Sequence, residues 1–328
     1  MTIPTGLGLV GRLCLPDDFP APGPAVLLIA GSGADTRDGD LDLPRPAGTD
    51  HPPGPGTFRK IAAHLALSGV ATLRWDKRGF GASGGDPDEA DYDTDLEDAE
   101  ACFRWLQARP EVDASRVGVA GHSAGALTAC RLCRDVPEVA AAGLLGGLAS
   151  PIEDLLRRNL GRYLDHRDDF TPEQQAWLER EMPAQLVMAE NMDRLLEAAR
   201  AGERSVRLEG HGMVVDRRTA RLAQDLATDY AAEFRYVRCP TLVLHGGADL
   251  NVDVDDALVA YRALRRAGND DVRLMVLPGL DHYFIPVAAD PARRLWDRVT
   301  QGALRRPMAQ EALDVLTAWA VRALSAPR

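Results

Sequence analysis

The sequence lacks the features that would indicate a membrane protein, a nucleic-acid binder or a secreted protein. No apolar segment approaches the roughly 18 residues that span a bilayer. The 38 basic and 49 acidic residues leave a net charge of −11, which argues against nucleic acids and anionic membranes as partners. The start of the chain has no basic segment followed by an apolar one, as a secretory leader would have. We therefore expect a cytoplasmic protein that does not insert into a membrane.

Cysteines are also scarce, and there are five of them, an odd number. Cys130 and Cys133 form a Cys-x-x-Cys pair, but this pair lies in a helix-like stretch without a second pair or a histidine cluster. Zinc and redox sites need such companions or a different context. The sequence therefore predicts no metal site and no cofactor. It leaves the oligomeric state open.

The chain does contain a regular alternation of short apolar runs and amphipathic stretches. The runs predict strands at residues 25–30, 70–75, 117–120, 140–148, 241–245 and 272–277. Helical spacing predicts helices at 58–67, 93–108 and 308–324. Strands and helices in alternation are typical of an α/β protein with a mostly parallel sheet flanked by helices.

One long stretch interrupts this alternation. From residue 151 to 236 we find no convincing strand, only helical patterns such as the capping box of Thr171-Pro172-Glu173-Gln174. We therefore predict a helical cap inserted between two core strands. The predicted domains are a first part of the core at 1–150, the cap at 151–236 and a second part of the core at 237–328.

Two segments are candidates for shaping a substrate pocket. The cap contains Trp177 and four of the seven methionines, namely Met182, Met188, Met192 and Met213. These side chains either pack the cap helices together or line an adaptable apolar pocket. The segment 35–56 is rich in Pro, Gly and Asp and has no periodicity, so we expect it to shape the mouth of the site.

The most informative motif is Gly121-His122-Ser123-Ala124-Gly125. It follows a predicted strand and precedes a helix-like stretch. A serine on such a tight turn has an exposed Oγ, and the two glycines are needed because side chains there would collide with the strand and helix beside them. Ser123 is therefore the candidate nucleophile, and it requires a base and an acid.

The base and the acid are expected on loops after later strands. His282 follows the last predicted strand in a Gly-containing loop, which can carry an imidazole to the carboxyl edge of the sheet. Asp249 follows the preceding strand, while Asp253, Asp255 and Asp281 are the alternatives nearby. The order Ser, Asp, His along the chain is that of one fold.

Two other histidines lie near these positions. His122 adjoins Ser123, and we expect its side chain to point another way off the turn. His245 ends a strand, and we expect it to pack the loop that follows.

With these motifs, the chain resembles the α/β-hydrolases. The similarity comprises Gly-His-Ser-Ala-Gly, His-Gly-x-x-Asp-x-x-Val at 245–252, Gly-x-Asp-His-x-Phe at 279–284, and an Asp-x-Arg-Gly-x-Gly-x-Ser turn at 76–83. It covers about residues 20–150 and 236–326. The 76–83 turn is interpreted as a braced tight loop and not as part of the catalytic set.

This resemblance implies a serine hydrolase that cleaves a small-molecule ester or thioester through an acyl-enzyme on Ser123, with His282 as base and Asp249 as its partner. It also implies an oxyanion hole of two backbone N–H groups, from Ala124 and Ser32, with Gly33 the alternative to Ser32. An acyltransferase or cyclase, an aminopeptidase-like enzyme and a carbon–carbon bond hydrolase could use the same triad. A non-catalytic ligand-binding protein with this fold is the alternative from another class.

Overall fold

The structure is a computed structural model, and it divides the chain into two compact units. It describes residues 1–3, 6, 8–19, 21–32, 36–40, 54–87, 90–300 and 302–325. Unit 1 comprises Met1–Ala149, Ala231–Ala288 and Asp297–Arg328, and unit 2 comprises Ser150–Tyr230 and Ala289–Trp296. Of the predicted 35–56 segment, only residues 36–40 and 54–56 lie within the described part.

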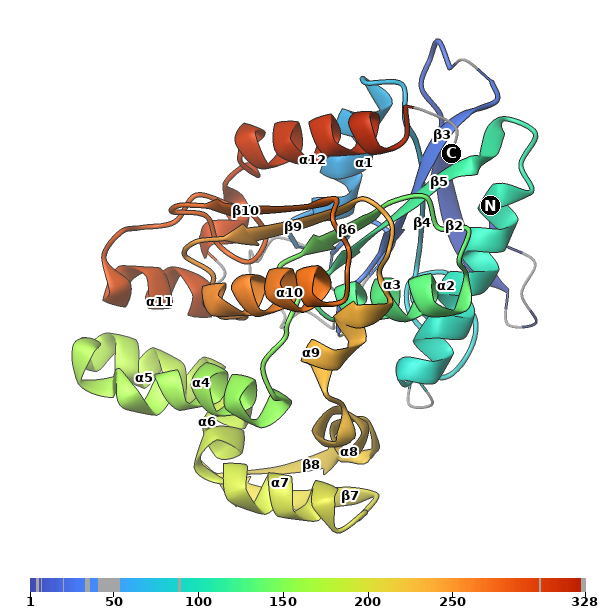
Figure 1. Cartoon of the computed structure of the whole chain (residues 1–328). Helices are drawn as coiled ribbons and strands as arrows, with labels where there is room; N and C mark the ends of the chain where they lie inside the picture. Colours follow the sequence, from blue (N-terminus) through green and yellow to red (C-terminus); the bar gives the residue numbers. More distant parts are fainter. Residues whose placement is uncertain are drawn as a thin grey trace. The chain divides into compact units, whose positions relative to one another are not determined.

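Unit 1 is built on a sheet that, within the described residues, has eight strands in the order β1-β2-β4-β3-β5-β6-β9-β10 (Figure 1). The strands are β1 (Thr2–Ile3), β2 (Leu9–Cys14), β3 (Gly23–Ile29), β4 (Ala71–Trp75), β5 (Val112–His122), β6 (Ala142–Leu145), β9 (Thr241–Gly246) and β10 (Val272–Leu277). In the part of the sheet from β4 to β10, every pair of neighbouring strands is parallel. Strand β2 is antiparallel to both of its neighbours, β1 and β4. The predicted mostly parallel sheet is therefore confirmed.

Helices cover both faces of this sheet (Figure 1). On one face lie α1 (Thr57–Ala66) and α12 (Gln310–Ala323), and on the other lie α2 (Tyr92–Gln107), α3 (Ala124–Asp135) and α10 (Val254–Arg266). Ile61 and Trp319 belong to the apolar cluster of the first face, and Phe103 belongs to that of the second. The short segments η3 (Phe234–Tyr236), η4 (Gly302–Arg305) and, apart from Tyr230, α9 (Tyr230–Glu233) also belong to this unit. None of the helices in the described ranges is long and apolar enough to cross a bilayer.

The parallel strands determine where loops meet. Because β3, β5, β6, β9 and β10 run in one direction, the loops that follow them emerge at the same edge of the sheet. These loops contain Gly31, Ser123, Gly146, Asp249 and His282. Residues distant in sequence are thereby gathered at the carboxyl edge, where ligands bind in open α/β sheets.

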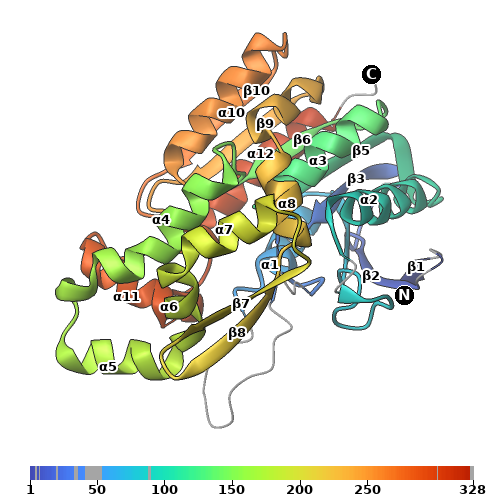
Figure 2. The ribbon, with the colours of Figure 1, turned by 90° about the horizontal axis from the view of Figure 1, so that it is seen from below.

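Unit 2 is mostly helical but also contains a hairpin (Figure 2). Its helices are α4 (Ile152–Asp165), η2 (Arg167–Asp169), α5 (Pro172–Glu181), α6 (Pro183–Glu190), α7 (Met192–Arg200), α8 (Ala220–Ala227) and most of α11 (Pro291–Val299). Strands β7 (Ser205–Gly210) and β8 (Met213–Arg218) pair antiparallel. The expectation of helices alone in 151–236 is wrong at this hairpin.

The local reason for the hairpin is its two-residue turn. Both loop residues have positive φ, 48° for His211 and 70° for Gly212, which is the conformation of a type I′ turn. In the strand before it, Val206 and Leu208 are buried while their neighbours Ser205, Arg207 and Glu209 are exposed. This alternation places Val206 and Leu208 in the apolar cluster of unit 2 with Val187, Leu195 and Ala198.

Candidate active site

Ser123 occupies a strained turn between β5 and α3. Its φ of 57° and ψ of −125° are unusual for a residue with a side chain, and such strain costs about 1–3 kcal/mol. A Cβ added to Gly121 would lie 2.0 Å from the Gly125 carbonyl oxygen, and one added to Gly125 would lie 2.4 Å from the Ile29 oxygen. Both distances are impossible, so the two glycines of the motif are required for this turn.

Asp249 and His282 are brought together by the loops after β9 and β10. His282 Nδ1 lies 2.7 Å from Asp249 Oδ2, and both side chains are buried. The other carboxylate oxygen of Asp249 accepts the backbone N–H groups of Asn251 and Val252, at 2.7 and 3.0 Å.

The charge of Asp249 is maintained by its partners. Burial opposes its ionisation and is the largest single influence, but the attraction of His282 and the hydrogen bonds together hold its pKa below the ordinary 3.8. An ionised Asp249 accepts a hydrogen bond from Nδ1–H of His282, so the Nε2 lone pair of that imidazole is available to take up a proton.

Asp281 builds the turn that carries His282. Its Oδ1 accepts the backbone N–H groups of Tyr283 and Ile285, at 2.9 and 2.8 Å, and Phe284 has a φ of 58°. Burial raises the pKa of Asp281 to about 6, although these N–H groups favour the charged form. Asp281 was one of the alternatives to Asp249 as the partner of the base, and in the structure its carboxylate stabilises the turn that carries His282.

The other two alternatives lie at the start of α10. Asp253 is the N-cap of this helix and accepts the backbone N–H of Asp255, which itself belongs to the first turn.

His122 contacts the same turn, a role that sequence reasoning missed. Its Nε2 lies 2.8 Å from the backbone oxygen of His282, and the centroids of the two imidazole rings are 4.6 Å apart. Burial, with a smaller contribution from His282, lowers the pKa of His122 to about 3. His122 is thus neutral and donates its Nε2–H to the His282 carbonyl, which ties the serine turn to the histidine loop.

His245 lies near the end of β9, and the prediction was that it packs the loop after this strand. It is fully buried, and its Nε2 is 3.2 Å from the carbonyl oxygen of Val252, in the loop that follows β9. The same nitrogen is 3.4 Å from Asp249 Oδ2. His245 therefore packs the loop that carries Asp249.

Ser123 and His282 are each in contact with a glycine of a neighbouring loop. A Cβ added to Gly31 would lie 3.0 Å from Ser123 Cβ, and one added to Gly146 would lie 3.3 Å from His282 Nδ1. Within the described part of the chain, Ser123 Oγ makes no hydrogen bond, so the structure does not join it to His282. Such bonds are often long in unliganded enzymes and tighten when substrate is present.

Two predicted oxyanion donors can be placed. Ala124 is the first residue of α3, where a backbone N–H has no partner within the helix. Ser32 follows Gly31, which lies against Ser123, and its side chain is exposed. Gly33, the alternative to Ser32, lies outside the described residues.

The predicted pocket residues of the insertion pack within unit 2. Met188 and Met213 lie against its apolar cluster, and Met192 is buried. Trp177 is in edge contact with Trp296, with ring centroids 5.3 Å apart. Met182 is the residue between α5 and α6.

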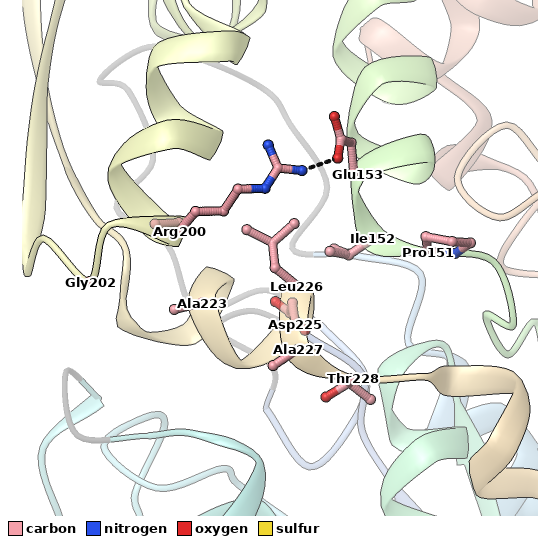
Figure 3. A pocket seen from close by; sticks show the side chains of 11 residues that line it. Pro151, Ile152, Glu153, Arg200, Gly202, Ala223, Asp225, Leu226, Ala227 and Thr228 are labelled. Atoms are coloured by element: carbon pink, nitrogen blue, oxygen red, sulfur yellow. Dashed lines mark hydrogen bonds and ion pairs between the residues drawn. The ribbon is translucent and has the colours of Figure 1, made fainter.

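Unit 2 also has a cavity of about 480 Å³, which none of these five residues lines (Figure 3). Its walls come from α4, α7 and α8, and Figure 3 shows the ion pair between Glu153 and Arg200 at its side.

Neither metal ligands nor reactive thiols are evident in the described ranges. No group of three or more His, Cys, Asp or Glu side chains there could hold a metal ion. Cys130 and Cys133 lie on α3 as free thiols. Burial raises the pKa of Cys130, and a hydrogen bond with Cys239 together with burial raises that of Cys133.

Comparison with known families identifies the family to which the chain belongs. Residues 55–285 match the family model described as serine aminopeptidase, S33, and this range is more than half of the chain. The chain belongs to this family of α/β-hydrolases. No curated protein sequence matches this α/β-hydrolase.

Solved structures with the same fold cover almost the whole hydrolase. The α/β-hydrolase GrgF from Penicillium sp. sh18 is 19% identical with a TM-score of 0.59, over 99% of this chain and 98% of that one. Est1E from Butyrivibrio proteoclasticus, solved with ferulic acid bound, is 16% identical with a TM-score of 0.56, over 93% and 98%. An esterase from Pyrococcus furiosus is 17% identical with a TM-score of 0.53, over 94% and 89%. At these identities the likeness establishes the fold.

Proposed function

We propose that this hydrolase cleaves a small-molecule ester or thioester through an acyl-enzyme on Ser123. The observation that carries the proposal is the buried 2.7 Å contact between His282 Nδ1 and Asp249 Oδ2, at the sheet edge where the strained Ser123 turn also emerges. An imidazole oriented in this way is the base that a serine hydroxyl needs. Membership of an α/β-hydrolase family supports the same chemistry.

The proposed reaction has two halves. Ser123 Oγ attacks the acyl carbonyl carbon while His282 Nε2 takes the hydroxyl proton, and the tetrahedral oxyanion accepts the N–H groups of Ala124 and Ser32. His282 then gives this proton to the departing alcohol or thiol, which leaves the acyl group on Ser123. Water attacks the acyl-enzyme with His282 again as base, and the acid is released with Ser123 regenerated.

Unit 2 is proposed to select the substrate. It is inserted after β6, the neighbour of the strand that carries Ser123, and before β9, the strand that precedes Asp249. Its methionines and Trp177 are adaptable apolar groups of the kind that line acyl pockets. The proposal for these particular side chains rests on their residue type and on their place in the insertion.

The test is turnover of p-nitrophenyl esters of increasing chain length by purified protein. We expect Ser123→Ala to lower kcat by about 10⁶ and Asp249→Asn by about 10⁴, because the first removes the nucleophile and the second leaves the histidine in the wrong tautomer. Asp253→Asn is the matched control, since asparagine is also a good N-cap and activity should persist. Undiminished turnover in Ser123→Ala would reject the assignment.

An aminopeptidase is the second candidate, because the matched family model carries that description. Aminoacyl p-nitroanilides and thioesters, assayed beside the esters, distinguish these substrate classes by kcat/KM. A fluorophosphonate probe tests the non-catalytic alternative, since stoichiometric labelling of Ser123 requires an activated nucleophile.

A further inference from the structure

The buried cation Lys77 is attached to the loop that precedes Ser32. Its Nζ donates a hydrogen bond to the Gly31 carbonyl oxygen at 3.0 Å and lies 3.3 Å from Asp95 Oδ1. Its side chain is only 9% exposed. Lys77 belongs to the 76–83 turn, which follows β4, so the contact crosses from one strand end to the next.

The geometry of a peptide group gives this contact a consequence. The Gly31 carbonyl and the Ser32 N–H belong to the same planar peptide, and in a trans peptide they point in opposite directions. A hydrogen bond that holds the carbonyl toward Lys77 therefore holds the N–H away from Lys77. Gly31 itself is in contact with Ser123, because a Cβ added to it would lie 3.0 Å from Ser123 Cβ.

The ammonium group of Lys77 also increases the hydrogen-bond strength of the Ser32 N–H as a donor. Hydrogen bonds from charged groups are stronger than neutral ones, and bonds in a chain polarise one another. Electron density drawn toward the Gly31 oxygen leaves the Ser32 N–H more positive. The contact thus orients this N–H and makes it a better donor to an anion.

We propose that Lys77 is a positioning residue for the oxyanion hole, acting through the Gly31–Ser32 peptide. This inference rests on the proposed acyl-enzyme chemistry and on Ser32 as one of its two donors. Lys77 does not touch the substrate in this role. The cavity beside it has a volume of about 10 Å³, which holds at most one water molecule.

The neighbouring Arg78 offers a matched control. It lies on the same turn with a side chain that is 13% exposed, and it forms an ion pair with Asp98 at 2.8 Å. Its ion pairs and hydrogen bonds are to acidic residues of α2 and not to the Gly31–Ser32 peptide. Removal of either cation takes an ion-pair partner from a carboxylate of α2, so both changes should cost stability.

The experiment compares Lys77→Met with Arg78→Met in a p-nitrophenyl ester assay, with inhibition by a boronic acid that forms a tetrahedral adduct on Ser123. Loss of a whole oxyanion donor lowers kcat by about 10²–10³, and misorientation of one should lower it by about 10- to 100-fold. We expect Lys77→Met to lower kcat and the affinity for the boronic acid by the same factor, with KM unchanged within about 2-fold. Arg78→Met should lower the Tm with kcat, KM and inhibition nearly unchanged.

The possible failures can be separated. If kcat and boronic acid affinity fall no further in Lys77→Met than in Arg78→Met, the role of Lys77 is rejected while the triad stands. If wild-type turnover does not depend on Ser123, the proposed function is rejected and this inference with it. Should Lys77→Met not fold, Lys77→Arg keeps a cation but alters the hydrogen bond. The same pattern is then expected at about 3- to 10-fold, and an unchanged kcat would overturn the role.

Discussion

Charged side chains near the candidate site of unit 1 are used differently from those of unit 2. In unit 1, Arg74 pairs with Asp38 while its side chain is only 5% exposed, and Lys77 is similarly buried. In unit 2, Arg157 and Arg200 pair with Glu153, but their side chains are 44% and 52% exposed. Buried pairs are costly to disrupt, whereas exposed pairs contribute about 0–1 kcal/mol and are screened by salt. The comparison teaches that the buried ion pairs near the candidate site hold loops of unit 1 in place. The exposed ion pairs of unit 2 contribute little to the conformation of that unit.

The buried apolar clusters are also more extensive in unit 1 than in unit 2. Unit 1 has a large buried cluster on each face of its sheet. In unit 2 the cluster around Val187 and Leu195 has five buried members, with partly buried side chains around them. Because local stability follows buried apolar contact, we expect unit 2 to open at a lower free energy than the sheet of unit 1.

The largest expected difference concerns glycine replacements. Gly121→Ala should destabilise the protein by more than about 4 kcal/mol, because the new Cβ would meet the backbone of Gly125 in unit 1. Gly161→Ala is the control in unit 2, where the nearest atom to the new Cβ is the flexible Asp165 carboxylate at 3.6 Å. Within helix α4 this change should stabilise by about 0.5–1 kcal/mol. Urea unfolding followed by circular dichroism measures both, and equal losses would contradict the comparison.

The next effect is a pH dependence that arises from two buried groups of unit 1. The pKa of His122 is about 3 in the fold against an ordinary 6.5, so the unfolded chain gains a proton first and stability falls as pH decreases below 6.5. The pKa of Asp281 is about 6 against 3.8, so the folded chain gains a proton first and stability rises as pH decreases from 6 to 3.8. Each slope is about 1.4 kcal/mol per pH unit, and the two cancel between about pH 4 and 6.

Single variants should expose each slope in urea unfolding at pH 4, 5 and 6. His122→Gln leaves Asp281, so its free energy of unfolding should increase as pH falls. Asp281→Asn leaves His122, so its free energy of unfolding should decrease. Parallel pH profiles for the wild type and both variants would show that these groups do not control the pH dependence.

The smallest effect is expected for Glu153→Gln in unit 2. Glu153 accepts hydrogen bonds from Arg157 and Arg200 at an exposed site, so its loss should cost at most about 1 kcal/mol. The cost should shrink further in 0.5 M NaCl, about the concentration at which surface charges are strongly screened. A double-mutant cycle with Arg200→Gln, measured at low and high salt, isolates the pair. A coupling that salt does not change would mean that unit 2 holds its charges as unit 1 does.

The sequence predicted the six parallel strands of the sheet because each contains a short apolar run, whereas it missed β1 and β2. The predicted strand at 272–277 coincides with β10, and the one at 241–245 is one residue shorter than β9. The expectation that the loops after these strands bring Asp249 and His282 together follows from parallel topology alone. The roles assigned to them and to Ser123 in catalysis stay predictions.

Other features depended on contacts that no local pattern contains. The β7–β8 hairpin was missed because its turn is His211-Gly212, whereas Asn-Gly or Asp-Gly is the usual signal. The contact of His122 is to a carbonyl 160 residues away, and that of Lys77 is to one 46 residues away. Backbone carbonyls occur at every position, so nothing in the sequence distinguishes these two.

The position of β10 has a consequence for how the protein comes into being. This strand is the last of the sheet along the chain, it lies at an edge of the described sheet, and it pairs with β9. A nascent chain that stops before residue 272 already contains Ser123 and Asp249 but not the histidine. Under the proposed mechanism, turnover begins only after β10 and the loop that carries His282 have been synthesised and have docked, so that activity would report the completion of the sheet.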